Sequence, residues 1–434
     1  MLLYAEHITA RLQYIVAYLE QYLFESPVKL TQDAAQFLQY KGPKINYSKK
    51  KICENEWFLR PAGLLEQEEI VNLVPTVDKY LQRIVLFPQQ QSDHPFDIFS
   101  ALFYVLSRYE EYLPHAKDAF GRFSHEDSLA WKHCFLNIPL ADYWMADLKT
   151  ALQERFSDIR VRNISFSFTP TYDIDIAWSY LHKGFMRNMG GMLRDVTRFD
   201  VNAVSERIAV LMRKQSDPFD VYDWLENEHR TRKLRPVYFF LLSKLQHPLD
   251  KNIHPHQKAL QLLVQQIGKS NQIGLHPSMH SNKSNPAFMQ EVEMFKQISG
   301  SLPLCSRQHY LHFDLPNTYQ RLLAAGISEE YSMGYGTVNG FRASTSKSFY
   351  WYDLQNETAT NLLLHPMAFM DANAFYESKS SVDVALQELK ALYASVKAVN
   401  GNFITLFHNH ILGSASVFRG WRNMYLSFLD HVSD

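Results

Sequence analysis

Short apolar segments alternate with amphipathic segments from about residue 160 to the end of the chain, and this alternation limits the possible folds more than any other feature. The segments with strand character are 163–171, 235–242, 272–276, 303–310, 329–333, 361–367 and 402–408. Apolar residues recur at helical spacing in 203–214, 219–229, 256–268, 286–299, 316–325, 380–399 and 419–431. Strands separated by helices form parallel sheets. The sequence therefore predicts an α/β fold whose parallel sheet is either open or closed into a barrel.

The first third of the chain has a different pattern. Helical spacing is found at 1–25, 96–112 and 143–156, and short strand candidates lie at 45–48, 56–59 and 83–88. We place a domain boundary after residue 158, so that residues 1–158 form a mixed α/β domain of unknown role and residues 159–434 form the second domain. Arg108 is expected to pair with Glu110 and Glu111. We find no catalytic pattern here and expect a role in packing, partner binding or substrate gating.

Composition excludes several classes of protein. The 434 residues carry a formal net charge of −1, which gives no reason to expect nucleic acid or an anionic membrane as the main partner. Cys53, Cys134 and Cys305 are far apart and odd in number, so no disulfide framework is expected. The N-terminus lacks the pattern of a signal peptide, and no segment is apolar enough to cross a bilayer. We expect a cytoplasmic protein, and no pattern indicates an oligomeric state.

Two carboxylates directly follow the first strand of the alternating region. Ile164, Phe166 and Phe168 alternate with polar residues, as in an extended chain. If the chain stays extended, Asp173 and Asp175 point the same way, and two like charges so close are unfavourable unless a cation or a donor lies between them. A turn whose Asp side chains bond local amides would also account for an isolated Asp-x-Asp.

Polar and titratable residues collect at the carboxyl ends of five of the predicted strands. After the two aspartates, these residues are His276 and His280, Arg307 and His309, His365, and His408 and His410. In an α/β barrel the carboxyl ends of all strands meet at one face, where catalytic groups lie. Packing alone does not account for this convergence, so we expect an active site at this end of the barrel.

The spacing of two histidines indicates a metal site. His276 and His280 are four residues apart, and Pro277 suits the first position of a helical turn, so both imidazoles could face one point. One carboxylate and two imidazoles, with open positions for water and substrate, suit Zn²⁺; Co, Ni and Fe are also compatible. In the alternative interpretation His276 ends a strand and His280 faces solvent.

The order of these motifs resembles the polysaccharide deacetylase superfamily, the chitooligosaccharide deacetylase (NodB) homology domain of the carbohydrate esterases. The motifs are Asp-Ile-Asp at a first strand end, His-x3-His, an Arg-containing strand end and a late His after an apolar strand, and they cover about residues 160–434. The Asp-x-Asp form is similar to the branch with peptidoglycan deacetylase-like and allantoinase-like members. Residues 107–112 and 121–123 add a similarity to a two-domain group of this superfamily found in Bacteroidetes.

This resemblance implies a distorted (β/α) barrel of seven or eight strands and metal-dependent removal of acyl groups from amides. It implies that Asp173 is the general base, that Arg307 orients this base and that His408 is the general acid. The metal ligands that it implies are Asp175, His276 and His280.

The chain departs from the family pattern at several positions. His309 stands where the third motif usually has proline, although Tyr310 follows it, and His410 is a second candidate for the acid. His365 and Asp371 either line the site or fill the barrel mouth. The residues that we assign to substrate binding are Tyr172, His309, Tyr310, His365, Asp371 and His410.

Three functions are compatible with these motifs. The first is a metal-dependent hydrolase that removes an acetyl group from an N-acetylated sugar or glycan precursor. The second is a C–N hydrolase of a small non-sugar amide, as in the allantoinase-like branch, and the third is a catalytically silent homologue that binds a glycan or a protein partner. The expected lack of an export signal favours a soluble sugar conjugate or glycan precursor over a polymeric cell-wall substrate.

Overall fold

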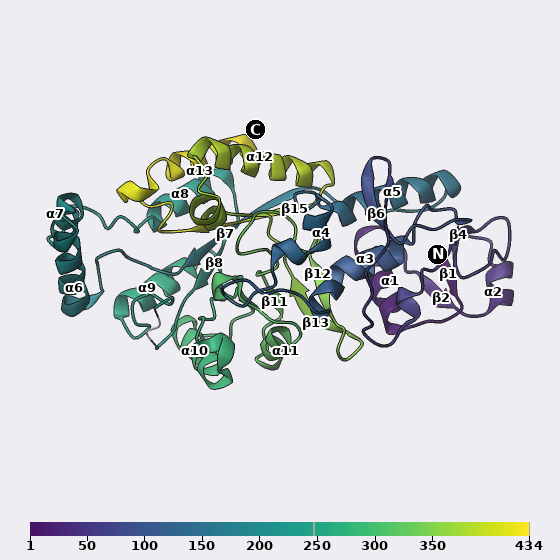
Figure 1. The fold of residues 1–434 in the computed structure, drawn as a ribbon, viewed down its shortest axis with the longest axis horizontal. Helices are drawn as coiled ribbons and strands as arrows, with labels where there is room; N and C mark the ends of the chain where they lie inside the picture. The colour runs from purple at the N-terminus through teal and green to yellow at the C-terminus, as the bar shows by residue number, and fades with distance from the viewer. Residues whose placement is uncertain (246–247, 434) are drawn as a thin grey trace.

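The chain folds into three parts that follow one another along the long axis of the molecule (Figure 1). The computed structural model describes residues 1–245 and 248–433. The N-terminal region lies at one end, the large sheet with its helices occupies the middle, and a pair of helices, α6 and α7, stands at the other end. The predicted α/β class is confirmed.

The N-terminal region contains a small parallel sheet in the order β2-β1-β3-β4. Its strands are β1 (Leu2–Ala5), β2 (Lys29–Thr31), β3 (Lys44–Tyr47) and β4 (Trp57–Leu59), and β5 (Val77–Tyr80) pairs with β6 (Arg83–Leu86). The helices are α1 (Ala10–Tyr22), α2 (Ala34–Gln39), α3 (Ile98–Leu106), α4 (Leu129–Lys132) and α5 (Leu140–Arg155). The prediction of one helix over residues 1–25 is wrong at its start. Leu2 and Leu3 are buried in β1, and α1 begins only after Thr9, whose hydroxyl accepts from Leu12 N.

The second region contains a nine-stranded sheet among the described residues, in the order β12-β13-β11-β10-β9-β8-β7-β15-β14. All seven predicted strands are present in it, with shorter bounds in most cases. The strands are β7 (Ser167–Ile174), β8 (Val237–Phe240), β9 (Gln272–Leu275), β10 (Cys305–Ser306), β11 (Glu329–Glu330), β12 (Phe349–Asp353), β13 (Thr358–Leu364), β14 (Phe369–Met370) and β15 (Asn402–His408). Only β12 is antiparallel to its neighbour.

The sheet curls into a distorted barrel because one stretch of chain changes partners. Strand β13 pairs with β11, and β14, a few residues further on, pairs with β15. Between them, Met367 N donates to Met333 O at 3.1 Å and Ala368 N donates to Ile404 O at 3.1 Å. The segment 358–370 therefore joins the last parallel strand to β15 and closes the ring, as the prediction of a distorted barrel requires.

Alternation along the strands separates the inside of the barrel from the outside. One buried cluster contains Phe239, Ile404 and Leu406 and lies inside the ring, while Tyr238 and Phe407 belong to the larger core between the sheet and its helices. Successive side chains of a strand point to opposite faces. On β7, therefore, Asp173 shares the inner face with Thr171, and its neighbours on either side in the sequence face outward.

Helices cover the outside of the barrel as the predicted alternation requires (Figure 1). They are α8 (Tyr222–Arg232), α9 (Lys258–Ile267), α10 (Asn285–Ser299), α11 (Asn317–Ala324), α12 (Val382–Ala398) and α13 (Trp421–Ser433). Two further helices, α6 (Gly184–Thr197) and α7 (Val201–Leu211), pack on each other. The sequence analysis missed α6, which contains Gly190 and Gly191 in its middle. Within the described ranges, no helix has the length and apolarity needed to span a membrane.

Buried ion pairs join the N-terminal region to the barrel. Arg108 donates to Glu110 at 2.9 Å and to Glu111 at 2.7 Å, so the predicted structural pairing is confirmed. Arg342 of the barrel region donates to both carboxylate oxygens of Glu111, at 2.9 and 2.6 Å. Burial raises the pKa of Glu111, but Arg342 and Arg108 outweigh this and lower it to about 2. The carboxylate therefore stays charged, and the two regions share one core.

We expect Gly274→Ala to destabilise the fold, because β9 passes close to side chains that fill the barrel. A Cβ at Gly274 would lie 2.6 Å from Phe239 and 2.7 Å from the Cys305 sulfur. The free energy of unfolding, measured in urea, should fall by about 1–3 kcal/mol. Gly190→Ala is the matched control, since its Cβ would meet nothing within 4 Å and alanine favours a helix by up to about 1 kcal/mol. Unchanged stability of Gly274→Ala would contradict the described packing.

Candidate active site

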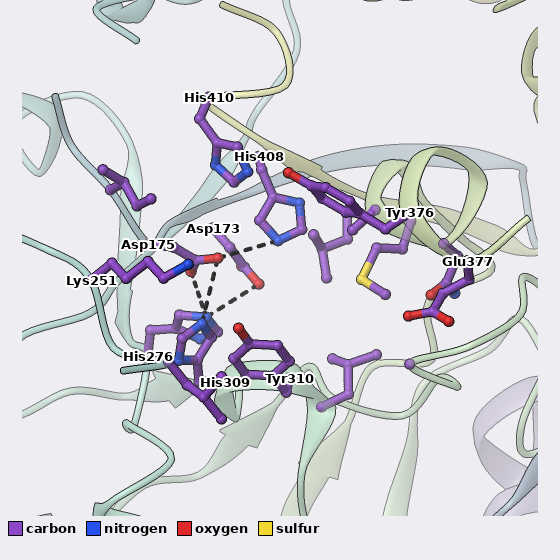
Figure 2. Close-up of a pocket in the computed structure, with 18 of the residues that line it drawn as sticks. Asp173, Asp175, Lys251, His276, His309, Tyr310, Tyr376, Glu377, His408 and His410 are labelled. Carbon is purple, nitrogen blue, oxygen red and sulfur yellow. Dashed lines mark ion pairs between the residues drawn. The ribbon is translucent and has the colours of Figure 1, made fainter. Parts of the chain in front are cut away.

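The predicted site residues at the carboxyl ends of the strands surround the floor of one cavity (Figure 2). Asp173 is on β7 and Asp175 directly follows it, while His276 directly follows β9. His309 comes three residues after β10, and His408 is the last residue of β15. The cavity has a volume of about 810 Å³ and is lined by all five of these residues.

Three of these side chains form a group that could hold a metal ion. One ligand atom from each of Asp175, His276 and His309 lies within 4.8 Å of the others. Asp175 Oδ1 is 3.0 Å from His276 Nε2, and Asp175 Oδ2 is 3.6 Å from His309 Nε2. Both imidazoles are buried. Figure 2 shows the two rings and the Asp175 carboxylate turned toward one another.

The second nitrogen of each ring is fixed by a hydrogen-bond acceptor. His276 Nδ1 donates to the backbone oxygen of Arg307 at 2.5 Å, and His309 Nδ1 donates to Asp250 Oδ1 at 2.7 Å. An imidazole whose Nδ1 carries the proton presents a lone pair on Nε2, and this is the usual state of a metal-bound histidine. Both Nε2 atoms are therefore set to accept a cation.

The atoms in this group fit a divalent ion. Within the described ranges, Asp175 Oδ1 and His276 Nε2 are buried and have no hydrogen-bond partner, although they lie only 3.0 Å apart. Two lone pairs so close are unfavourable unless a proton or a metal ion lies between them. A set of two imidazoles and one carboxylate is typical of zinc sites that keep positions open for water and substrate.

The charges within the group also favour a bound cation. Burial lowers the pKa of His309, but Asp175 and Asp250 outweigh this and raise it to about 10. Burial raises the pKa of Asp175, but His309, His276 and His408 hold it well below its usual value. The site therefore keeps its carboxylate ionised, and positive charge compensates it, either as a proton on His309 or as a metal ion in its place.

Asp173 lies beside the group and is held by an arginine. Arg307 Nη1 donates to Asp173 Oδ1 at 2.9 Å, and Asp173 Oδ2 is 3.5 Å from His276 Nε2. Arg307 is itself fixed, because its Nε donates to Tyr331 O at 3.0 Å and its guanidinium lies 4.5 Å from the Phe239 ring centre. One Asp173 oxygen is thus anchored while the other faces the candidate metal group.

His408 approaches the same group from the opposite wall (Figure 2). Its Nε2 is 3.5 Å from Asp175 Oδ2, and its Nδ1 donates to Asp371 Oδ1 at 2.6 Å. Asp371 Oδ2 also accepts from the backbone N of His408 at 2.7 Å. Burial lowers the pKa of His408, but Asp371 outweighs this and raises it to about 9. His408 is therefore an imidazolium at neutral pH, with a proton on each ring nitrogen, and its Nε2 faces the cavity.

The sequence analysis expected His280 as a metal ligand, but His280 does not belong to the group. His309 occupies that place instead. The expected helical turn does not start at Pro277: in this described stretch a 3-10 turn, Ser281–Lys283, begins only after His280. Instead, Ser278 binds the buried Glu291 through both its backbone N, at 3.0 Å, and its hydroxyl, at 2.5 Å. These bonds hold the loop so that His280 lies outside the set of residues that line the cavity.

Two residues that we assigned to substrate binding lie away from the cavity. Tyr172 faces the outside of the barrel, where its hydroxyl is 2.7 Å from His229 Nε2 and also contacts Tyr425. The assignment was wrong because adjacent residues of a strand face opposite sides, and Asp173 faces inward. His365 stacks on Tyr331 with 4.2 Å between ring centres, and its Nε2 is 3.3 Å from Glu329. It packs at the barrel and does not line the described cavity.

The remaining assignments concern the walls of the cavity. Tyr310 and His410 line it, whereas Asp371 is fully buried behind His408 and acts on that ring. Burial, and then the charge of His408, lowers the pKa of His410 to about 3, so this imidazole is neutral. Of the two late histidines, His408 is thus the one in the imidazolium form at neutral pH.

Several cavity residues were missed by the sequence analysis. Phe120 and Arg122 come from the N-terminal region, where we found no catalytic pattern. Phe120 stacks on Tyr310 with 5.1 Å between ring centres, and Arg122 Nη1 donates to Tyr310 O at 2.7 Å. Asp250, which fixes His309, lies in a loop between β8 and α9 whose sequence has no recognisable motif. The other missed lining residues with polar side chains are Arg194, Arg198, Lys251, Asn373, Tyr376 and Glu377.

Comparisons with known proteins found one family model and several solved structures that match parts of this chain. Residues 1–157 match a family model described as a family of unknown function (DUF7033). The search of curated proteins found no match. Solved structures also match, covering 62–63% of this chain in the three cases given below.

The solved structures carry names from the superfamily that the motifs resemble. One, from Mycobacterium smegmatis, is named provisionally as a polysaccharide deacetylase; it shares 10% identity over 63% of this chain and 85% of its own, with a TM-score of 0.41. Puue allantoinase shares 12% identity over 62% of this chain and 84% of its own, with a TM-score of 0.39. A family 4 carbohydrate esterase pseudoenzyme from Bacillus anthracis shares 7% identity over 62% of each chain, with a TM-score of 0.31.

We expect His309→Ala to lose metal binding and His280→Ala to retain it. Of these two histidines, His309 is in the group with Asp175 and His280 is outside it. Each purified variant would be stripped with a chelator and titrated with zinc and cobalt in a calorimeter. His309→Ala should weaken binding by at least tenfold, and His280→Ala should match the unmodified protein. The reverse result would restore the His276/His280 pair and contradict the geometry described above.

Proposed function

We propose that this protein is a metal-dependent hydrolase that removes an acetyl group from the nitrogen of an N-acetylated sugar or glycan precursor. One observation carries the proposal: a buried group of two imidazoles and a carboxylate lies between an anchored carboxylate, Asp173, and a protonated imidazole, His408. Hydrolysis of an amide needs an activated water, a base and an acid. The arrangement supports all three requirements within one cavity.

Asp175, His276 and His309 would hold the divalent cation, most simply Zn²⁺. When bound, such an ion supplies Lewis acidity, which favours ionisation of water and polarises an amide carbonyl. The chain supports this arrangement from behind, because the Arg307 carbonyl and the Asp250 carboxylate each accept from an Nδ1 and leave Nε2 as the nitrogen that faces the cation. Outer partners of this kind orient a metal ligand and raise its basicity.

Asp173 would accept the proton of the attacking water. Its Oδ1 is bound by Arg307, so the proton would go to Oδ2, the oxygen nearer to the candidate metal group. The anchoring bond fixes the direction of this lone pair and lowers the entropic cost of reaching the reactive geometry. Arg307 is a positioning residue in this scheme, since it reaches the reacting atoms only through Asp173.

His408 would donate a proton to the departing amine from Nε2. Its Nδ1 is bound to Asp371, so the proton that can be transferred is the one on Nε2, which faces the cavity. His410 is neutral and packs against Phe219 and Phe418, which makes it a wall of the site in this proposal.

The size and walls of the cavity favour a sugar over a small amide. About 810 Å³ is near the upper end of the range for small-molecule sites. Stacked Phe120 and Tyr310 on one side, and Tyr376 on the π-helical turn Asn373–Glu377, offer aromatic surface of the kind that contacts sugar rings. A catalytically silent homologue would be expected to lack one of the reacting groups, and here each of them is present.

We expect the protein with its metal restored to release acetate from at least one member of a panel of chitooligosaccharides and nucleotide-linked N-acetyl sugars. Asp173→Asn keeps the shape of the side chain but removes the base, so kcat should fall by about 10²–10⁴-fold. Its zinc content should stay unchanged, because Asp173 is outside the proposed ligand set. Zinc binding without acetate release from any substrate would contradict the proposed reaction. Allantoin is included in the panel to test the alternative of a small non-sugar amide.

We expect Asp371→Asn to move the alkaline limb of the pH–rate profile to lower pH. The acid must be protonated, and the carboxylate of Asp371 raises the pKa of His408 to about 9 against the effect of burial. Activity should therefore fall as the pH rises toward that value. Loss of the carboxylate should shift this limb downward by about one pH unit or more, measured as kcat against pH. An unchanged limb, with kcat lowered at every pH, would assign Asp371 a purely structural role.

A further inference from the structure

The helices α6 and α7 form an arm that stands apart from the barrel at one end of the molecule (Figure 1). The arm, residues 183–214, exposes an unusual number of large apolar side chains. Phe185, Met186 and Phe199 are 75%, 80% and 90% exposed. Leu193, Val196, Val201 and Met212 are also exposed. Clusters of exposed apolar groups of this kind mark surfaces that contact another molecule or a membrane.

The polarity of the arm is reversed relative to an ordinary helical pair. The contact between the two helices is made by charged and polar groups: Arg207 pairs with Asp195 at 2.5 Å and donates to Asn188 at 3.2 Å. All three side chains are buried, as is Val210, while the large apolar residues named above are exposed. A helical pair in water buries its apolar stripe and exposes its charges. The outer face of this arm therefore suits an apolar medium.

Positive charge accompanies the apolar face. The arm has seven Lys and Arg residues and three Asp and Glu residues, in a chain whose net charge is −1. Arg194, Arg198, Arg213 and Lys214 are exposed. Apolar side chains together with lysine and arginine are the combination that binds the headgroup region of anionic lipid. The near-neutral total charge conceals this local excess.

Two residues of the arm also line the cavity of the candidate active site. Arg194 and Arg198, near the end of α6, line the same cavity as the proposed metal group, and Lys251 lines it as well. These three cations lie in a cavity whose proposed chemistry uses none of them. A phosphate linkage carries the charge that would pair with them.

We infer that the arm docks the protein on an anionic lipid surface, and that the cavity takes the acylated sugar of a lipid whose phosphate linkage lies beside Arg194, Arg198 and Lys251. The choice of sugar substrate rests on the proposed function; the docking does not. A second copy of the chain suits the arm less well, because a symmetric contact would bring its excess cations together. A lipid surface satisfies the apolar residues and the cations at once.

Flotation of the full-length protein with vesicles tests the docking. Vesicles of phosphatidylethanolamine and phosphatidylglycerol should carry the protein, and vesicles of phosphatidylcholine should carry it at least about tenfold less. The triple change Phe185→Ser, Met186→Ser and Phe199→Ser should lower binding to the anionic vesicles by about tenfold or more. Val74→Ser, Leu81→Ser and Leu304→Ser together form the matched control, since these residues are exposed outside the arm. The control should bind like the unmodified protein.

Two results would overturn the docking. One is equal flotation of the two triple variants; the other is an arm-dependent dimer, seen by sedimentation without vesicles and lost only in the arm variant. Because the substituted side chains are exposed, each variant should keep the thermal unfolding profile of the unmodified protein. Arg213→Glu with Lys214→Glu should also weaken binding to anionic vesicles, and high salt should have the same effect on the unmodified protein.

Acetate release separates this inference from the proposed function. With an N-acetyl sugar linked through phosphate to a long-chain lipid, presented in anionic vesicles, kcat/KM should exceed that for the free sugar phosphate by about tenfold or more, and the arm variant should lose this gain. Vesicle binding without acetate release from any substrate would contradict the hydrolase and leave the docking intact. Equal rates on free and lipid-linked sugars, with no vesicle binding, would contradict the docking and leave the hydrolase intact.

Discussion

The site depends on one buried carboxylate that is surrounded by imidazole nitrogens. Asp175 lies 3.0–3.6 Å from the Nε2 atoms of His276, His309 and His408. Each ring is held from behind by a different acceptor: the Arg307 carbonyl, Asp250 or Asp371. Those acceptors decide where the proton of each ring lies. In the proposed function, three similar histidines therefore take different roles, two as ligands of a cation and one as a proton donor.

The barrel brings these groups together through the alternation of its strands. Asp173 and Asp175 both point inward because they are two residues apart, and the same period places Arg307 and His309 on one side of their segment. Gly274, in β9, leaves room for the Phe239 side chain inside the ring. His276 directly follows β9. Strand β15 pairs directly with β7 and places His408 opposite Asp173, while the segment 358–370 joins β15 to the other side of the sheet. Positions far apart in the sequence thus meet at one end of the ring.

The sequence was sufficient to predict the barrel and the strand-end residues that surround Asp175, because both follow from periodicity. The same alternation should have excluded Tyr172, which is adjacent to Asp173 and so faces the opposite side. The error at His280 has a different origin. Spacing of four residues brings two histidines together only on a helix, and here the helical turn Ser281–Lys283 begins after His280. The loop before it is bound to Glu291 through Ser278. Glu291 is thirteen residues away in the sequence, and Asp250 lies in a loop, so no local pattern reveals either contact.

The N-terminal region completes the cavity instead of standing beside it as a separate domain. Arg122 is fixed by Asp118 and reaches across to the backbone of Tyr310. This approach requires a glycine on the barrel side, because a Cβ at Gly336 would lie 1.7 Å from the Arg122 guanidinium. Phe120 then stacks on Tyr310, next to the proposed metal ligand His309. Without residues 118–123 that wall of the cavity would be open to water, which weakens the electrostatic interactions on which amide hydrolysis depends. Both regions therefore supply walls of one cavity, although the matching family model covers only residues 1–157.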